Sequence, residues 1–140
     1  VVIYNTLSDE IKIIDIKTSG FGWSKKEKGD VVKMQQIIAY KTYFAKQYDI
    51  DPEKITIEYL VVKRKLYENL DFPQNRLQVV IPAHGKSKRR KVAEDFQRFI
   101  EDCFTPNGEY QAKEYPKTIS KESCQYCEFG KNKLCKKDQE

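Results

Sequence analysis

The sequence predicts an α/β or α+β domain, with a mixed central β-sheet flanked by helices. The first observation behind this class is a set of four runs that are rich in β-branched residues and predict strands: 1–6, 11–17, 55–65 and 77–83. The second is helical spacing of apolar residues in two other segments: 31–48 and 91–104. Because a helix separates the second strand from the third, we expect a right-handed crossover between them.

The first two strands are predicted to form a hairpin, since the stretch 7–10 between them has the composition of a turn. The stretch 18–29 that follows is rich in glycine and lysine and also carries Phe21 and Trp23. It is either a plain solvated connection or a mobile basic flap beside the second strand.

Both helices are predicted from an apolar stripe. Asp30 is a suitable N-cap for the first helix, and Pro52 excludes its continuation. The first helix is expected to pack on the sheet through a wide stripe: Val31, Met34, Ile37, Ile38, Phe44, Ala45 and Tyr48. The second has core spacing at Val92, Phe96, Phe99, Ile100 and Phe104.

Composition limits the class of protein. The chain has 140 residues, 39% of them hydrophobic, and can bury a core as one domain. Its net charge is +5, and its clustered lysines and arginines favour a polyanionic partner such as DNA, with a merely solvated surface as the alternative. No apolar run is long enough to span a bilayer, and the cysteines do not form a disulfide pattern. We therefore expect a cytoplasmic, reducing location and no membrane contact.

Asp15 and Lys17 form the central candidate site. Side chains two apart in a strand share a face, so a carboxylate and an ammonium are presented together, while Ile14 and Ile16 are predicted to face the core. A carboxylate suits Mg²⁺, and a lysine beside it can handle a water and stabilise a phosphate. The alternative is an ordinary surface ion pair.

Gln36 and Tyr40 are a second candidate pair. They lie one helical turn apart and so project from one side of the first helix. From there they could contact a phosphate or a base. The alternative is a polar helix edge with a half-buried tyrosine.

Basic residues are concentrated in two further places. Lys25 and Lys26 lie in the glycine-rich stretch, and the segment 85–91 precedes the predicted second helix. Positive charge at a helix N-terminus opposes the helix dipole, which favours a role in binding DNA phosphates over a solvated flank. The DNA-binding candidates are Lys25, Lys26, Lys86, Lys88, Arg89, Arg90 and Lys91.

Three cysteines near the C-terminus have metal-ligand spacing, C-x2-C-x7-C: Cys124, Cys127 and Cys135. An iron–sulfur cluster, Zn²⁺ and no metal all stay open, because three ligands are not four. Cys103 is expected to be a buried structural thiol, and His84 to be solvent-exposed. The predicted division is a core of residues 1–118 and a cysteine-rich tail of residues 119–140.

The strings IIDIKTS and QIIAY, together with the cysteine trio, resemble the RecB-like branch of the PD-(D/E)XK nuclease superfamily. The resemblance implies a restriction-endonuclease-like core and an Mg²⁺- or Mn²⁺-dependent DNA nuclease, with a C-terminal [4Fe–4S] cluster. It implies that Asp15 and the Ile16 carbonyl bind metal and that Lys17 is the catalytic lysine. Gln36 and Tyr40 would contact DNA or tune the site. A phage or bacterial recombination setting, with a helicase or similar partner, is also implied.

The chain departs from the family pattern by lacking a second acid and the histidine that often lies on an earlier helix, and by the seven-residue second gap of its cysteine tail. The pattern needs another acid on the strand before the hairpin turn, and Asp9 and Glu10 lie in the turn itself. We expect that acid upstream of Val1, in a larger protein. The alternatives are a non-cleaving DNA-binding or assembly module with the same fold, and a zinc-ribbon-like tail on an unrelated α/β domain. Strand polarity, endo- or exonuclease action and strand preference do not follow from the sequence.

Overall fold

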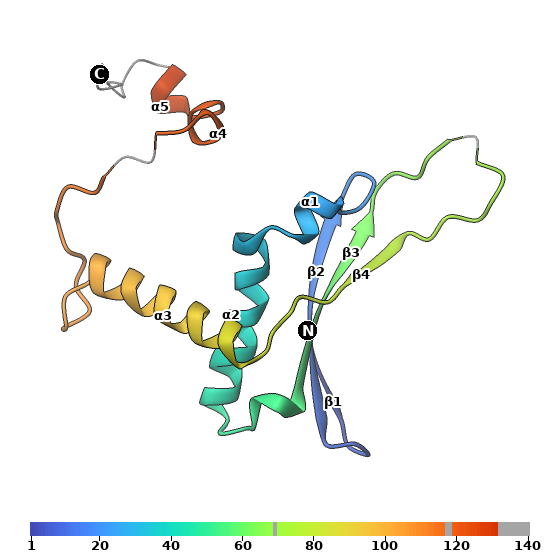
Figure 1. Ribbon diagram of the computed structural model, residues 1–140, viewed down its shortest axis with the longest axis horizontal. Coiled ribbons are helices and arrows are strands. Elements are labelled where there is room, and N and C mark those ends of the chain that lie inside the picture. Colours follow the sequence, from blue (N-terminus) through green and yellow to red (C-terminus); the bar gives the residue numbers. More distant parts are fainter. Residues whose placement is uncertain (69, 117–118, 132–140) are drawn as a thin grey trace. The chain divides into compact units, whose positions relative to one another are not determined.

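The computed structural model describes residues 1–68, 70–116 and 119–131. The chain divides into two compact units, Val1–Cys103 and Phe104–Glu140. The first unit holds a four-stranded mixed sheet with two long helices beside it (Figure 1). This arrangement confirms the predicted fold class.

The sheet has the strand order β1-β2-β3-β4. Its strands are Val2–Asn5, Glu10–Ser19, Ile55–Lys63 and Leu77–Val80. β1 and β2 are antiparallel and form the predicted hairpin, β2 and β3 are parallel, and β3 and β4 are antiparallel. The β2–β3 crossover contains α1 (Lys25–Lys28), α2 (Val31–Gln47) and a short 3₁₀ turn, η1 (Pro52–Lys54).

One face of the sheet is buried beneath α2. On β2 the buried residues are Ile11 and Ile13, which are 8% and 4% exposed, whereas Ile16 is 53% exposed. Because strand side chains alternate, Asp15 is in phase with Ile11 and Ile13 and lies on the buried face. The prediction that Ile16 points into the core is therefore wrong.

The core is formed mainly by β3 and α2. Alternate residues of β3 are 0–1% exposed, which is the pattern of a central strand with one face covered. Val31 and Tyr48, predicted to lie in the helix stripe, are more than half exposed, because they sit at the two ends of α2. The buried hydrophobic residues are Ile11, Ile13, Trp23, Ile37, Ile38, Ala45, Ile55, Ile57, Tyr59, Val61, Val80 and Val92.

The second long helix, α3, spans Lys86–Cys103 and begins five residues before the predicted start at 91. Lysine and arginine are good helix formers, so the basic segment continues the helix rather than preceding it. Ion pairs one turn apart, Arg90 with Glu94 and Lys91 with Asp95, accompany this extension. In the described structure Val92 is the buried residue of α3, and the predicted stripe is otherwise largely exposed.

The second unit contains two short helices, α4 (Lys121–Cys124) and α5 (Glu128–Lys131). Before them, Phe104 and Tyr110 form an isolated bridge around a turn in which Gly108 has φ +82°. The predicted boundary at 118/119 stays a prediction. Across the described residues, no helix combines the length and the apolar character that crossing a membrane requires.

Candidate active site

Asp15 and Lys17 lie together on the helix-covered face of β2, near its carboxyl end. The Lys17 Nζ atom is 3.1 Å from Asp15 Oδ2, and the two side chains are 35% and 16% exposed. A pair this close to the edge of the core is partly shielded from water, which strengthens its electrostatic interaction. The sequence prediction that the two side chains share a face is confirmed by this contact.

α2 brings its polar residues to the same place. Lys17 Nζ donates a hydrogen bond to Gln36 Oε1 over 2.8 Å, and Gln36 Nε2 donates to the Tyr40 hydroxyl over 3.0 Å. The contacts therefore run without a gap from Asp15 through Lys17 and Gln36 to Tyr40. Asp15 and Lys17 lie on β2, and Gln36 and Tyr40 lie on α2. The contact between Lys17 and Gln36 therefore joins residues that are 19 positions apart in the chain.

Tyr59 on β3 lies beneath this cluster. Its side chain is fully buried, and its hydroxyl donates to the carbonyl oxygen of Lys33 on α2. Burial raises the pKa of Tyr59 to about 12, and the negative charge of Asp15 acts in the same direction. The Lys17 Nζ atom lies 6.0 Å from the centre of the Tyr59 ring. The residue beneath the cluster is therefore a neutral tyrosine, which adds no charge that would compete with Asp15 or Lys17.

Asp15 has an acceptor that suits a hard cation. Its Oδ2 atom is buried and accepts no hydrogen bond from any described residue, although Lys17 Nζ lies 3.1 Å away as an ion pair. A buried carboxylate oxygen without a donor is costly, and oxygen ligands are what Mg²⁺ and Mn²⁺ prefer. This donor fits a divalent cation. Among the described residues no group of three or more histidine, cysteine or acidic side chains converges on a metal position.

The Ile16 backbone lies at an open edge of β2. Val1 and Ile14 exchange two backbone hydrogen bonds of 2.8 Å, and the described part of β1 continues the pairing away from Asp15. Because the bonding edge alternates along a strand, the carbonyl of Ile16 faces the same side as that of Ile14. An open pocket of about 480 Å³ adjoins this edge and is lined by Asp15, Ile16 and Tyr40 among others.

The two acidic residues of the β1–β2 turn are held elsewhere. Asp9 accepts a hydrogen bond from the Tyr4 hydroxyl and pairs with Lys54, and Glu10 accepts one from Ser8. Asp9 immediately precedes β2 and Glu10 begins it, whereas Asp15 and Lys17 lie toward its other end. Neither supplies a second carboxylate beside Asp15.

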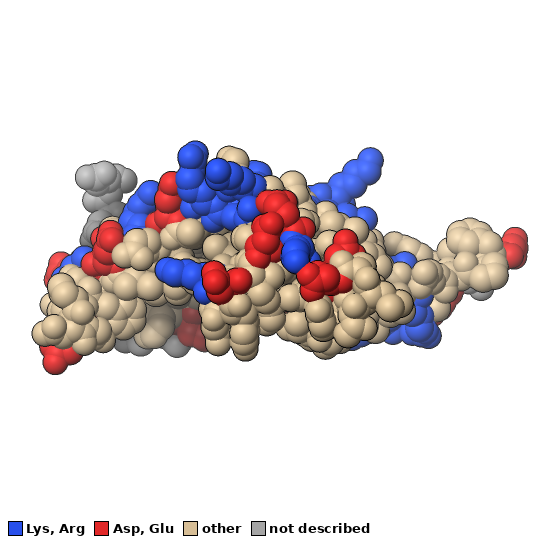
Figure 2. All heavy atoms as spheres, turned by 90° about the horizontal axis from the view of Figure 1, so that it is seen from below, with Lys and Arg blue, Asp and Glu red and all other residues tan. Residues whose placement is uncertain are grey.

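The basic residues predicted to bind DNA come from two elements. Lys25 and Lys26 lie on α1, and the others lie in the first turns of α3. A groove of about 380 Å³ has Lys28, Lys88 and Lys91 around an apolar floor, so α1 and α3 contribute to one surface. Figure 2 shows one face of the molecule, where lysine and arginine gather with acidic side chains beside them. Arg89 differs, since its guanidinium pairs with Glu53 and is 12% exposed.

Sequence reasoning missed a buried polar contact between α2 and the loop after β4. Lys41 is 0% exposed, and its Nζ atom is 2.8 Å from Nδ1 of His84. Burial lowers the pKa of both groups, and in each the nearby positive charge adds to the effect. His84 is therefore half-buried, and the expectation that it is solvent-exposed is wrong. The chain offered no signal for this pair, because the two residues are 43 positions apart.

Two of the three tail cysteines lie in the described structure. Cys124 ends α4 and Cys127 precedes α5, and the amide of Cys127 donates to the carbonyl of Cys124 over 3.3 Å. Both are free, partly buried thiols, as is Cys103, which was expected to be buried. Cys135 lies outside the described residues.

A family model described as the PD-(D/E)XK nuclease superfamily matches residues 2–135. No curated protein and no solved structure matches the chain significantly.

Proposed function

Since the chain belongs to the PD-(D/E)XK nuclease superfamily, with a mixed sheet that fits the restriction-endonuclease-like fold, we propose that it is a RecB-like DNA exonuclease that depends on Mg²⁺ or Mn²⁺. The observation that carries the proposal is the contact series of Asp15, Lys17 and Gln36, at 3.1 and 2.8 Å. An acid and a lysine in these positions are the residues that phosphodiester hydrolysis uses in this superfamily.

Asp15, whose Oδ2 atom is buried, and the backbone carbonyl of Ile16 would hold the divalent cation. When bound, the cation supplies positive charge that activates water and stabilises the phosphoryl oxygens. Lys17, whose ammonium group donates to Gln36, would orient the attacking water and stabilise negative charge on the phosphate. The Lys17 Nζ atom lies 3.1 Å from Asp15 Oδ2, so it is close to any group that Asp15 binds.

Gln36 and Tyr40 position the catalytic lysine and the DNA. The Gln36 carbonyl oxygen accepts from Lys17, which fixes the direction of the ammonium group, and its amide nitrogen donates to Tyr40. Tyr40 is 45% exposed, so its hydroxyl can reach a phosphate of the bound strand. Basic residues of α1 and α3, of which Lys88 and Lys91 line the groove of about 380 Å³, then bind neighbouring phosphates: Lys25, Lys26, Lys86, Lys88, Arg90 and Lys91.

In this proposal no described residue supplies a second acidic ligand, because Asp15 is the carboxylate beside Lys17. Asp9 and Glu10 are engaged at the far end of β2.

The cysteine tail holds a [4Fe–4S] cluster in this proposal, with Zn²⁺ as the alternative. The C-x2-C turn at Cys124 and Cys127 brings two thiols into one short segment, as a shared metal requires. Metal and sulfide analysis of anaerobically purified protein separates the two. A brown protein that absorbs near 400 nm, a feature of iron–sulfur chemistry, supports the cluster, and colourless protein with zinc contradicts it.

One observation favours a second candidate function. Among the described residues, Asp15 is the carboxylate next to Lys17, and a domain with one acid could bind DNA without cutting it. The two functions are separated by replacing Lys17 in the full-length protein. For a nuclease, Lys17→Met lowers single-turnover cleavage by about 10²–10⁴-fold and leaves DNA binding measurable.

Lys12→Met is the matched control. Lys12 lies on the same strand but out of phase with Lys17, and it pairs with Glu58 instead of Asp15. This variant should cut DNA like the unmodified protein. Full cleavage by Lys17→Met rejects the assignment of the lysine. Salt-sensitive DNA binding by the unmodified full-length protein, with no product in Mg²⁺ or Mn²⁺, supports the non-cleaving module.

A further inference from the structure

Phe21 and Tyr67 form an exposed aromatic pair just past the carboxyl ends of β2 and β3. Their ring centres are 4.8 Å apart and their planes differ by 22°, so the rings are stacked. We propose that this pair is a base-stacking platform for single-stranded DNA next to the active site, an inference that rests on the proposed nuclease function. It assigns a substrate class to that site.

The exposure of the two rings supports a binding role. Phe21 is 46% exposed and Tyr67 is 61% exposed. In a stacked pair each ring covers the inner face of the other, so the exposed area belongs to the outer faces and the edges. An open aromatic face is the surface on which an unpaired base stacks, whatever its sequence.

The rings are not needed to hold their own loops. The Gln74 side chain accepts from the amide of Tyr67 over 2.9 Å and donates to its carbonyl over 2.6 Å. The amides of Arg64 and Lys65 donate to the carbonyls of Ser19 and Gly20, each over 2.8 Å. Backbone and Gln74 contacts thus hold the loop, and the aromatic stack is a separate feature of its surface.

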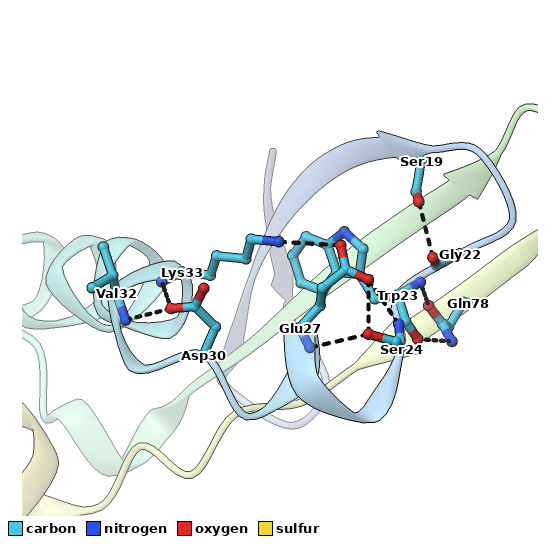
Figure 3. A network of polar contacts seen from close by, with 9 residues as sticks. All are labelled: Ser19, Gly22, Trp23, Ser24, Glu27, Asp30, Val32, Lys33 and Gln78. Atoms are coloured by element: carbon cyan, nitrogen blue, oxygen red, sulfur yellow. Dashed lines mark hydrogen bonds and ion pairs between the residues drawn. The ribbon is translucent and has the colours of Figure 1, made fainter. Parts of the chain in front are cut away.

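The loop that carries Phe21 is anchored on both sides (Figure 3). The Ser19 hydroxyl donates to the carbonyl of Gly22, and the Gln78 side chain accepts from the amide of Trp23 over 2.7 Å and donates to its carbonyl over 3.2 Å. Gly22 has φ +103°, and a Cβ there would come within 3.2 Å of the Gln78 side chain. Phe21 therefore lies in a loop that hydrogen bonds anchor at Ser19 and Trp23.

The platform is close to the catalytic lysine. The ring of Tyr59, which lies 6.0 Å from Lys17 Nζ, is 5.0 Å from the ring of Trp23. Trp23 comes two residues after Phe21 in the same anchored loop. Lys17 and Phe21 are themselves four residues apart, a backbone distance of about 14 Å at most. A strand held at Lys17 can therefore continue onto the rings.

Two cations flank the platform. Arg64 and Lys65 precede Tyr67 in the chain, are exposed, and form no ion pair with any described residue. Aromatic rings next to unpaired cations are the combination that binds a single strand, because the bases stack while the phosphates are neutralised. In a duplex the bases stack on each other and are not available. The geometry therefore favours single-stranded over double-stranded DNA.

The test measures binding in a Lys17→Met background, so that cleavage does not interfere. Fluorescence anisotropy compares a labelled oligodeoxythymidylate, an abasic strand of the same length and a duplex. Phe21→Leu and Tyr67→Leu should each weaken binding of the oligodeoxythymidylate by about 5- to 150-fold, the range for one lost base stack, and leave the abasic strand unchanged. Phe72→Leu is the control, since Phe72 is 62% exposed in the same β3–β4 connection and no ring contact joins it to another described residue.

Equal affinity of the oligodeoxythymidylate for the aromatic variants and the control overturns the proposal, and so does an equal loss on the abasic strand. A second variant keeps the test informative if the leucine variants fail to fold. Arg64→Gln with Lys65→Gln should reduce the salt slope of single-strand binding by about 1.4, from two lost phosphate contacts, while Lys46→Gln should not. An unchanged salt slope in the double variant also contradicts the proposal.

The nuclease assignment is measured apart from this binding, with Lys17 intact in the presence of Mg²⁺ or Mn²⁺. If no product forms but the aromatic variants still discriminate base-bearing from abasic strands, the nuclease function fails and the stacking platform stands. If product forms but the aromatic variants bind like the control, the platform fails and the nuclease stands.

Discussion

The Nζ atom of Lys17 donates a hydrogen bond to Oε1 of Gln36 over 2.8 Å, and this contact joins β2 to α2 at the candidate active site. A lysine ammonium rotates freely when it has no acceptor. Here the amide oxygen of Gln36 and the carboxylate of Asp15 approach it together, so its direction is set by residues from two elements. The helix thus acts on the chemistry through its orientation of the lysine.

Removal of Gln36 should separate orientation from binding. Gln36→Ala is expected to lower kcat by about 10- to 100-fold with little change in KM, because misplacement of a catalytic group by about 1 Å has effects of this size. The measurement is steady-state cleavage by the full-length protein. Gln35→Ala is the control, since Gln35 points to Asp95 on α3. A rise in KM with unchanged kcat would instead give Gln36 a role in binding DNA.

The burial of one sheet face predicts opposite outcomes for two isoleucines. Ile57→Ala should lower the free energy of unfolding by about 2–5 kcal/mol, because Ile57 is 1% exposed and its loss leaves a cavity. Ile16→Ala should cost much less, because Ile16 is 53% exposed. Urea unfolding measures both. Equal losses would mean that the second face of the sheet is also covered in solution.

The Lys41–His84 contact predicts a pH-dependent stability. Burial and the positive charges of Lys41 and Arg89 lower the pKa of His84 from its ordinary value of 6.5, and Glu53 partly offsets them. Below pH 6.5 the unfolded chain therefore binds a proton that the folded protein does not, and the free energy of unfolding falls as the pH falls from 6.5 toward the folded pKa.

Thermal unfolding between pH 5 and 7.5 checks this dependence. His84→Gln keeps a hydrogen-bonding side chain at the same place but does not titrate, so its Tm should vary less with pH over this window. The Lys41 pKa is also lowered, chiefly by burial, and Lys41 is present in both proteins that are compared. An identical pH profile for the two proteins would contradict the assignment.

The sequence predicted the strands, the first helix and the contact of Lys17 with Asp15 well, because these follow from short-range spacing. It could not tell which face of β2 is buried, since isoleucine occurs in both phases: Ile11 and Ile13 in one, Ile14 and Ile16 in the other. Only the docking of α2 decides between them.

The start of α3 and the burial of Lys41 were missed for different reasons. The start of α3 was missed because the apolar stripe that predicted this helix begins only at Val92. The burial of Lys41 was missed because lysine is expected at the surface. Lys41 is buried because His84, 43 positions later, supplies its hydrogen-bond partner. A contact of that sequence separation is set by the tertiary fold.

The most direct test of the central claim is single-turnover cleavage of a labelled oligonucleotide by the full-length protein, with and without Asp15→Asn. Asparagine keeps the shape of the side chain but removes the charge that would hold the cation. We expect cleavage by the unmodified protein in Mg²⁺ or Mn²⁺, none in excess chelator, and a loss of at least about 10²-fold in the variant. Cleavage by Asp15→Asn at the unmodified rate, or cleavage that persists in chelator, would contradict the account.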